Sequence, residues 1–283
     1  LLASSAASDV YKRQFYNSER LKYNQMNYNN DVELDNFCSQ CLLVINAVGP
    51  SFKINDKIAL HALRNNCHYI DIGGYGILRD LLKPYEKSIE AQKLCFIIGV
   101  GWMPGISGVF SKTIIETHLN SPENTNFNIY YGAVDNWSYS STYDLAASSM
   151  GKTRSYVYSH GKEIQVSPFR YTHHKFFPFI GHKKICMPSF DEQLTQLATS
   201  LKQIRKISTF IMLNDYISMG KFMFIKIFYK HNLNKATLML QDDYQRLVKK
   251  ENKWGSVICQ VSKIEPERKI CLLYTSPSPR DIS

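Results

Sequence analysis

The sequence predicts an α/β protein in which a doubly wound parallel sheet is followed by an α+β domain. Three short runs of apolar, β-branched residues alternate with helical patterns over residues 41–115, which is the order of a parallel sheet with crossover helices. A polar connector at residues 119–126 then separates this region from segments in which strands and helices mix without that alternation.

Each expected strand of the first region is short, apolar and closed by glycine or proline. The runs are "CLLVINAVGP" (41–50), "CHYIDIGG" (67–74) and "CFIIGVG" (95–101). Continuous apolar runs of this length are typical of strands that are buried on both faces of a parallel sheet.

Amphipathic patterns between these runs predict the crossover helices. Residues 55–66 place apolar side chains at helical spacing, residues 78–94 do so with a break at Pro84, and a third helix begins near Pro104. The carboxyl ends of parallel strands share one edge, where ligands of such sheets bind. We therefore expect the loops "NAVGPS", "IGGYG" and "GWMPG" to form a binding edge, although glycine after a strand is also ordinary turn chemistry.

The motifs "LLVINAVGP", "HYIDIGG" and "GVGWMPGISG" resemble, in order and spacing, part of the nucleotide-binding domain of saccharopine dehydrogenase-like oxidoreductases. The resemblance implies that the chain holds the C-terminal half of a Rossmann-like sheet, uses NAD or NADP, and transfers a hydride at a C–N, carbonyl or enoyl centre. It implies a set of cofactor-binding residues at the three loops: Asn46, Ala47, Val48, Gly49, Pro50, Gly73, Gly74, Gly101, Trp102, Pro104 and Gly105. The first turn of the next helix, at Ile106–Ser107, would offer N–H groups to an anionic group or be capped by Ser107 itself.

The family's first strand and its G-x-G-x-x-G loop do not occur in this chain, and the two ends of the sequence suggest a reason. Asp9–Gln14 and Cys271–Ser276 can be encoded by opposite strands of one DNA segment, and both resemble translated sequencing-adapter DNA. We therefore expect four segments: adapter-derived residues 1–14, a partial dinucleotide-binding domain at 15–121, a truncated α+β substrate domain at 122–270, and adapter-derived residues 271–283. Such a fragment is expected to bind a dinucleotide poorly and to aggregate.

The second region offers few groups for proton transfer, which hydride chemistry needs beside the reacting carbon. The segment "DNWSYSSTYD" contains Tyr139 and Tyr143, and "RYTHHKFFP" contains Arg170 and His173. An arginine there would bind a carboxylate substrate through paired hydrogen bonds. For each of these four residues an ordinary packing or surface role is the competing interpretation.

Composition and cysteine usage limit the kinds of partner and the cellular compartment that we expect for this chain. The chain has 283 residues and a net charge of +10, but its basic residues are scattered, so we do not expect a nucleic-acid partner. Cys38 and Cys41 form a lone C-x-x-C without a second pair at zinc spacing, and the other cysteines stand singly. This usage predicts buried thiols, no metal and a reducing, cytoplasmic compartment. Charges interrupt the most apolar stretch, residues 207–228, so no membrane span is expected. The expected partner is a small-molecule substrate, and a homodimer is possible.

Two other functions stay open at this stage. A non-catalytic dinucleotide-binding or scaffold protein could keep the same fold without the chemistry. A basic module for nucleic acid would show salt-sensitive retention on heparin and DNA.

Overall fold

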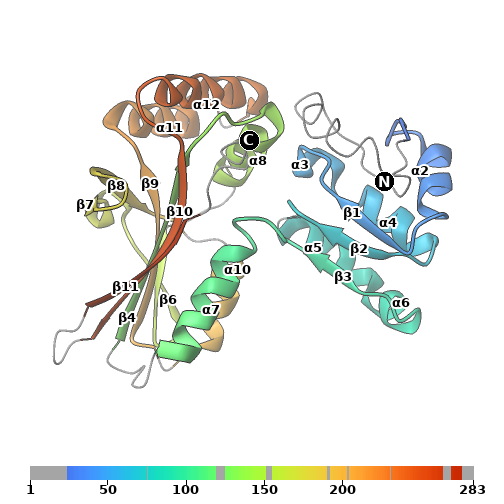
Figure 1. Cartoon of the computed structure of the whole chain (residues 1–283), viewed down its shortest axis with the longest axis horizontal. Helices are drawn as coiled ribbons and strands as arrows, with labels where there is room; N and C mark the ends of the chain where they lie inside the picture. Colours follow the sequence, from blue (N-terminus) through green and yellow to red (C-terminus); the bar gives the residue numbers. More distant parts are fainter. Residues whose placement is uncertain are drawn as a thin grey trace. The chain divides into compact units, whose positions relative to one another are not determined.

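The computed structural model divides the chain into two compact units, one ending at Gly101 and the other beginning at Trp102 (Figure 1). Each unit is described by itself. The structure describes residues 24–74, 76–118, 125–150, 155–189, 192–202, 204–229, 231–263 and 269–275.

Unit 1 contains a parallel sheet of three strands in the order β1-β2-β3. The strands are β1 (Leu43–Asn46), β2 (His68–Asp71) and β3 (Phe96–Ile98). Ile45, Ile70 and Ile97 lie side by side in the pairing register, so the three carboxyl ends share one edge. The predicted order of three parallel strands is therefore confirmed.

Residues 55–66 and 78–94 of unit 1 form helices as the amphipathic patterns predict, whereas its first two helices, at residues 31–38 and 51–54, are not among the predicted ones. The helices are α2 (Asp31–Cys38), α3 (Ser51–Ile54), α4 (Lys57–Arg64), α5 (Gly76–Leu82), the 3-10 turn η2 (Lys83–Tyr85) and α6 (Glu86–Ala91). Pro84 lies within η2, between α5 and α6. Because proline cannot donate the helical hydrogen bond, the long pattern over residues 78–94 breaks into these shorter pieces.

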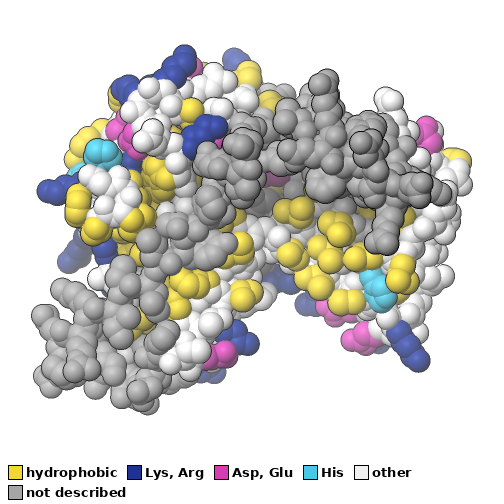
Figure 2. Space-filling view, viewed as in Figure 1, with side chains coloured by type: hydrophobic (Ala, Val, Ile, Leu, Met, Phe, Trp, Pro, Cys, Tyr) yellow, Lys and Arg dark blue, Asp and Glu magenta, His cyan; other side chains and the backbone are white. Residues whose placement is uncertain are grey.

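Only one face of this sheet is covered by the described helices, so the expectation of strands buried on both faces is wrong. Val44 and Tyr69 point to the covered face, where they pack with Leu34, Ile58 and other side chains of the helices. The opposite face presents apolar side chains to solvent, with Ile45 60% and Ile97 47% exposed. Figure 2 shows this hydrophobic area on the sheet of unit 1.

The C-x-x-C pair of unit 1 is part of the covered core. Cys38 is buried, and burial raises the pKa of its thiol to about 12. The neighbouring Cys67 donates weak hydrogen bonds of 3.0 Å to the carbonyl oxygens of Cys38 and Cys41. The pair therefore packs the interface between α2 and the start of β2, as the sequence predicts for structural cysteines.

Unit 2 contains a second sheet of mixed direction, in which the main strand order is β11-β10-β4-β9-β5-β6 and β8 joins β7 to β9. Strands β4 and β9 pair in parallel, and the other pairs are antiparallel. The strands are β4 (Thr125–Val134), β5 (Tyr156–Ser159), β6 (Lys162–Gln165), β7 (His173–Phe177), β8 (His182–Pro188), β9 (Lys206–Leu213), β10 (Trp254–Lys263) and β11 (Lys269–Thr275).

Helices cover this sheet with two separate cores. The helices are α7 (Ile106–His118), α8 (Tyr139–Met150), α9 (Pro168–Tyr171), α10 (Glu192–Ser200), α11 (Tyr216–Phe228) and α12 (Leu233–Val248). One core joins α7 and α10 to β4, β9 and β10, and includes Ile115, Leu194 and Val257. Another joins α8, α11 and α12 to the ends of β8 and β9. Because α7 packs on α10 and β10, unit 2 begins earlier in the chain than the predicted boundary at 121–122.

Alternating segments on either side of His160-Gly161, in "RSYVYSHGKEIQVSP", predict a hairpin in unit 2. Strands β5 and β6 form the expected hairpin, and its turn residues His160 and Gly161 have φ values of 49° and 72°. Positive φ at both positions is the backbone of the tight hairpin turn that matches strand twist. The apolar stretch 207–228 becomes most of β9 and all of α11, and no described helix is long and apolar enough to cross a membrane.

The segments expected to be adapter-derived have little described structure. Residues 1–14 and 276–283 lie outside the described residues. Cys271–Thr275 lie within β11, which pairs with β10 in antiparallel register. The origin of these residues stays a prediction.

An ion pair joins the start of α11 to α12. The Asp215 carboxylate accepts hydrogen bonds from the Ser218 backbone at 2.8 Å and from two Arg246 nitrogens at 2.6 and 3.0 Å. Partial burial opposes ionisation, but the hydrogen bonds from Arg246 and Ser218 outweigh it and hold the pKa of Asp215 well below its ordinary value. This carboxylate therefore caps α11 and ties it to α12 at the same time.

Asp215→Asn should lower the free energy of unfolding by about 1–2 kcal/mol at neutral pH, because it removes a charged cap and a paired ion. A carboxylate whose pKa is lowered in the folded state stabilises above its unfolded pKa, and this contribution declines as pH falls below about 4. Urea unfolding at several pH values measures both effects. Asp242→Asn is the control, because Asp242 is a surface partner of Lys221 and should change little. If the difference in unfolding free energy between the parent and Asp215→Asn stayed constant down to pH 2, the lowered pKa of Asp215 would be contradicted.

The open sheet face of unit 1 should promote aggregation. Ile45→Thr with Ile97→Thr keeps β-branched side chains while making the face more polar, so light scattering should fall and the unfolding free energy should change by less than about 1 kcal/mol. Val44→Thr, on the covered face, is the matched control and should destabilise without reducing scattering. If the double variant aggregates as the parent does, this face is not the source.

Candidate functional site

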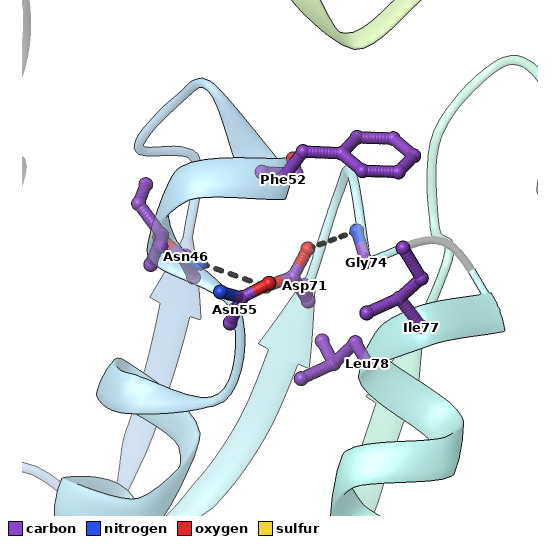
Figure 3. A pocket seen from close by; sticks show the side chains of 9 residues that line it. Asn46, Phe52, Asn55, Asp71, Gly74, Ile77 and Leu78 are labelled. Carbon is purple, nitrogen blue, oxygen red and sulfur yellow. Dashed lines mark hydrogen bonds between the residues drawn. The ribbon is translucent and has the colours of Figure 1, made fainter. Parts of the chain in front are cut away.

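A pocket opens at the carboxyl ends of β1 and β2, between α3 and α5 (Figure 3). Its polar lining includes Asn46, Asn55 and Asp71, which come from the two strand ends and the turn after α3. Phe52 and Leu78 supply part of its apolar lining. The expected binding edge therefore contains a small pocket of mixed polarity, with a cavity volume of about 10 Å³.

Three buried polar side chains join the two strand ends beneath this pocket. Asn46 donates from Nδ2 to Asp71 Oδ2 at 2.7 Å and to the Tyr69 hydroxyl at 3.0 Å. The Tyr69 hydroxyl donates to the same Asp71 oxygen at 2.6 Å. Because Asn46 and Asp71 are register partners on neighbouring strands, their side chains project from the same face and meet.

The same carboxylate and amide also hold the backbone of the loops. Asp71 Oδ1 accepts the Gly74 N–H, and Asn46 Oδ1 accepts the Val48 N–H at 3.0 Å. Burial, followed by the neighbouring Asp71 charge, raises the pKa of Tyr69 far above its ordinary value, so this phenol stays a donor. The network therefore fixes both loops at the edge, and we name it the Asp71 network: Asn46, Tyr69, Asp71 and the Gly74 amide.

The two glycines after β2 are required by close packing within the chain. A Cβ on Gly73 would lie 2.0 Å from Ser51 Oγ, and a Cβ on Gly74 would lie 2.6 Å from Leu78 Cδ2. Neither side chain could be added unless those neighbours moved. The chain's own contacts are thus sufficient to explain glycine at both positions.

The third loop is organised differently from the first two. Gly101 ends unit 1, whereas Trp102, Pro104 and Gly105 belong to unit 2. The Gly105 N–H donates to Gln193 Oε1 at 2.8 Å, and the Ser107 N–H donates to the Trp102 carbonyl at 3.1 Å. Residues of the chain therefore bind the N–H groups of Gly105 and Ser107, so the Ser107 N–H, one of the two groups expected for an anion, already has a partner within the chain. Helix α10 packs on α7, and this contact places the Gln193 side chain at the start of α7.

The four candidates for chemistry fall into two places within unit 2. Arg170 and His173 line one open pocket together with Phe210 of β9. Tyr139 and Tyr143 lie on α8 and do not line that pocket. The Tyr139 hydroxyl donates to Asn234 of α12 at 2.8 Å, which gives it a packing role between the two helices.

Sequence reasoning missed the central members of the site. The strand motif "HYIDIGG" contains Tyr69 and Asp71, but the pattern does not mark them as site residues, although Asp71 ends an apolar strand as Asn46 does. Asn55 was missed as well, and its backbone at φ 51° and ψ −130° is one that side chains other than glycine rarely adopt. A polar residue at the end of each of two successive apolar strands was the available signal.

Three further residues expected to bind the cofactor lie in the loop that follows β1. Ala47, Gly49 and Pro50 form the loop between β1 and α3, where Pro50 is the residue before the first turn of α3. Among the described residues, no group of three or more His, Cys, Asp or Glu side chains could hold a metal ion.

Comparisons with known proteins find only weak structural similarity and no sequence match. No protein-family model matches the chain, and no curated protein sequence matches it. A structure described as an oxidoreductase from Bacillus subtilis has a TM-score of 0.36 and 8% identity, with 97% of this chain and 74% of that chain covered. A dehydrogenase from Clostridium difficile has a TM-score of 0.36 and 8% identity, with 99% and 82% covered. TM-scores this low do not establish a shared fold, so no residue role is transferred from either structure.

Asp71→Ala should destabilise unit 1 far more than Tyr69→Phe. The first change leaves three buried donors without their acceptor and should cost about 3 kcal/mol or more. The second removes one donor to Asp71 and one acceptor of Asn46, and should cost about 1–2 kcal/mol. Urea unfolding of each variant and of the double variant measures the coupling between the two residues. Equal losses for the two single variants would show that Asp71 is not the shared acceptor.

Proposed function

We propose that the chain is part of an NAD(P)-dependent oxidoreductase similar to the saccharopine dehydrogenase-like enzymes. In this proposal the carboxyl edge of the unit 1 sheet, as half of a Rossmann-like fold, receives the nicotinamide half of NAD or NADP. The observation that carries it is the parallel order β1-β2-β3, which brings two of the motif loops to one edge around a pocket. Ligands of open parallel α/β sheets bind at this edge.

A nicotinamide ring would lie over the mouth of the pocket, because the cavity itself has a volume of about 10 Å³. Phe52 offers apolar surface for a flat ring, and the amide of Asn55 offers hydrogen-bonding groups for a carboxamide. The Nδ2 donors of Asn46 are already bonded to Asp71 and Tyr69. The Asp71 network holds the loops in place before any ligand arrives, which lowers the entropy cost of binding. When bound, the dinucleotide would supply the hydride, and the chain's part is to position it and exclude water.

The groups for substrate and proton transfer are proposed within unit 2. Arg170 would bind a carboxylate substrate, and His173, which lines the same pocket, would supply a proton at the reacting centre. Tyr139 and Tyr143 are the alternative proton donors, at the other place in unit 2. The reaction would be hydride transfer at a C–N, carbonyl or enoyl centre, and the compartment is proposed to be the cytoplasm.

A second candidate is a dinucleotide-binding or scaffold protein that carries out no chemistry. The observation that favours it is the bonding of the polar groups to one another. The Asp71 carboxylate is taken up by three donors, and the Tyr139 hydroxyl bonds to Asn234. In a longer protein that carries the glycine-rich loop, reduction of NAD or NADP by amino-acid substrates would separate the two candidates, because a scaffold binds the nucleotide without turnover.

Reduced nicotinamide mononucleotide should bind the isotope-labelled chain at millimolar concentration and shift the amide resonances of Val48, Gly49 and Gly74. This probe carries only the half of the cofactor that the proposal assigns to these loops. Gly49→Leu should weaken binding about tenfold or more, because bulk in the loop keeps the ring from the backbone.

Gly220→Leu is the matched control, since open space surrounds Gly220 and the residue lies on α11. Thermal melts of both variants should stay close to that of the parent. Shifts confined to unit 2, or affinity unaffected by Gly49→Leu, would reject the proposed nicotinamide site.

A further inference from the structure

Strand β9 changes its partner along one side, and the change leaves a pocket between two hairpins. Lys206 and Ile207 of β9 pair with the end of β5, whereas Phe210 and the residues after it pair with β8. The chain from β6 through α9 to β7 spans this fork, and its residues line the pocket together with Phe210.

Rings and aliphatic side chains form the body of this pocket. Phe210 and Val166 are buried, and Ile164 lines the rim with 47% of its surface exposed. The His173 ring stands edge-on to Phe210 at 4.8 Å between centroids, and Phe210 stacks on Tyr130 at 5.1 Å. Stacked and edge-on rings hold one another in place, so the pocket offers a rigid, flat-sided surface.

The charge of the pocket has one sign. Arg170 lines it, and no aspartate or glutamate is among its lining residues. Lys206 lies over the Tyr171 ring at 5.0 Å from the centroid. Arg170 is exposed, so its fork of donors can meet an anion in the pocket.

The histidine is oriented by the backbone. His173 Nδ1 lies 3.1 Å from the Tyr171 carbonyl, and a neutral ring that donates there keeps Nε2 as an acceptor. A bound molecule would therefore meet a guanidinium, an imidazole nitrogen and flat apolar walls together.

We propose that this pocket of unit 2 is a binding site for a small aromatic carboxylate. Arg170 binds the carboxylate through its paired donors, and the aromatic body lies against Phe210, Tyr171 and Ile164. A planar anion fits this combination better than a phosphate does, because the pocket supplies apolar walls and a fork that matches two carboxylate oxygens. This inference rests on the proposed function, because it names the class of carboxylate that the proposed function assigns to Arg170, but its binding test does not depend on a dinucleotide in unit 1.

Calorimetric titration of the whole chain with sodium benzoate and with benzamide tests the proposal. Benzamide has the same flat body without the charge, so benzoate should bind roughly tenfold tighter or more. Arg170→Ala should weaken benzoate roughly ten- to hundredfold and leave benzamide unchanged, while Arg170→Lys should give an intermediate loss. Arg64→Ala, an exposed arginine of α4, is the control and should change neither affinity.

The rim residue Ile164 gives a second test that does not touch the core. Ile164→Asp should abolish benzoate binding through repulsion, and Ile164→Lys should retain it or tighten it. Circular dichroism checks that both variants fold. The proposal is overturned if benzoate shows no saturable binding at millimolar concentration, if Arg170→Ala binds it as the parent does, or if the two Ile164 variants behave alike.

Discussion

The Asp71 carboxylate is the interaction on which the organisation of the unit 1 edge depends. It is buried, and it accepts from an amide, a phenol and a backbone N–H that belong to two strands and a loop. A buried carboxylate with fewer donors would be costly, whereas three donors compensate its loss of water. The same carboxylate links β1, β2 and the Gly74 backbone. The hydrogen bonds that it accepts therefore fix the positions of the residues that line the pocket.

Glycine-rich loops at strand ends have two physical explanations, and this chain separates them. At Gly73 and Gly74 the space for a side chain is already taken by Ser51, Leu78 and Asp71. Internal packing therefore requires glycine there without any ligand. The side chains of Asn46, Asp71 and Phe52 line the pocket (Figure 3), and the polar groups of Asn46 and Asp71 are bonded to one another and to the loop backbone.

In unit 2 the corresponding constraint is the position of β9. It pairs in parallel with β4 and in antiparallel with both β5 and β8, so three segments far apart in sequence meet along it. Both faces of β9 are buried, one against α7 and α10 and the other against the aromatic cluster of Tyr130, Phe177 and Phe210. The fork between the hairpins is a consequence of this pairing, and it brings Arg170 and His173 together.

Local pattern alone determined much of this protein. Alternating apolar runs and amphipathic helices predicted β1, β2, β3 and the helices between them, and Pro84 predicted the break between α5 and α6, because these features depend on neighbours in sequence. The adjacency of His160 and Gly161 likewise predicted a turn. Tertiary structure decided what such patterns do not contain. It left one face of the sheet open and placed Gln193 at the start of α7. It also brought Asn46 into hydrogen-bonding distance of Tyr69 and Asp71. Each of these features depends on register or packing between segments that are remote in sequence. An apolar run has the same sequence pattern whether one face of its strand is covered or both are.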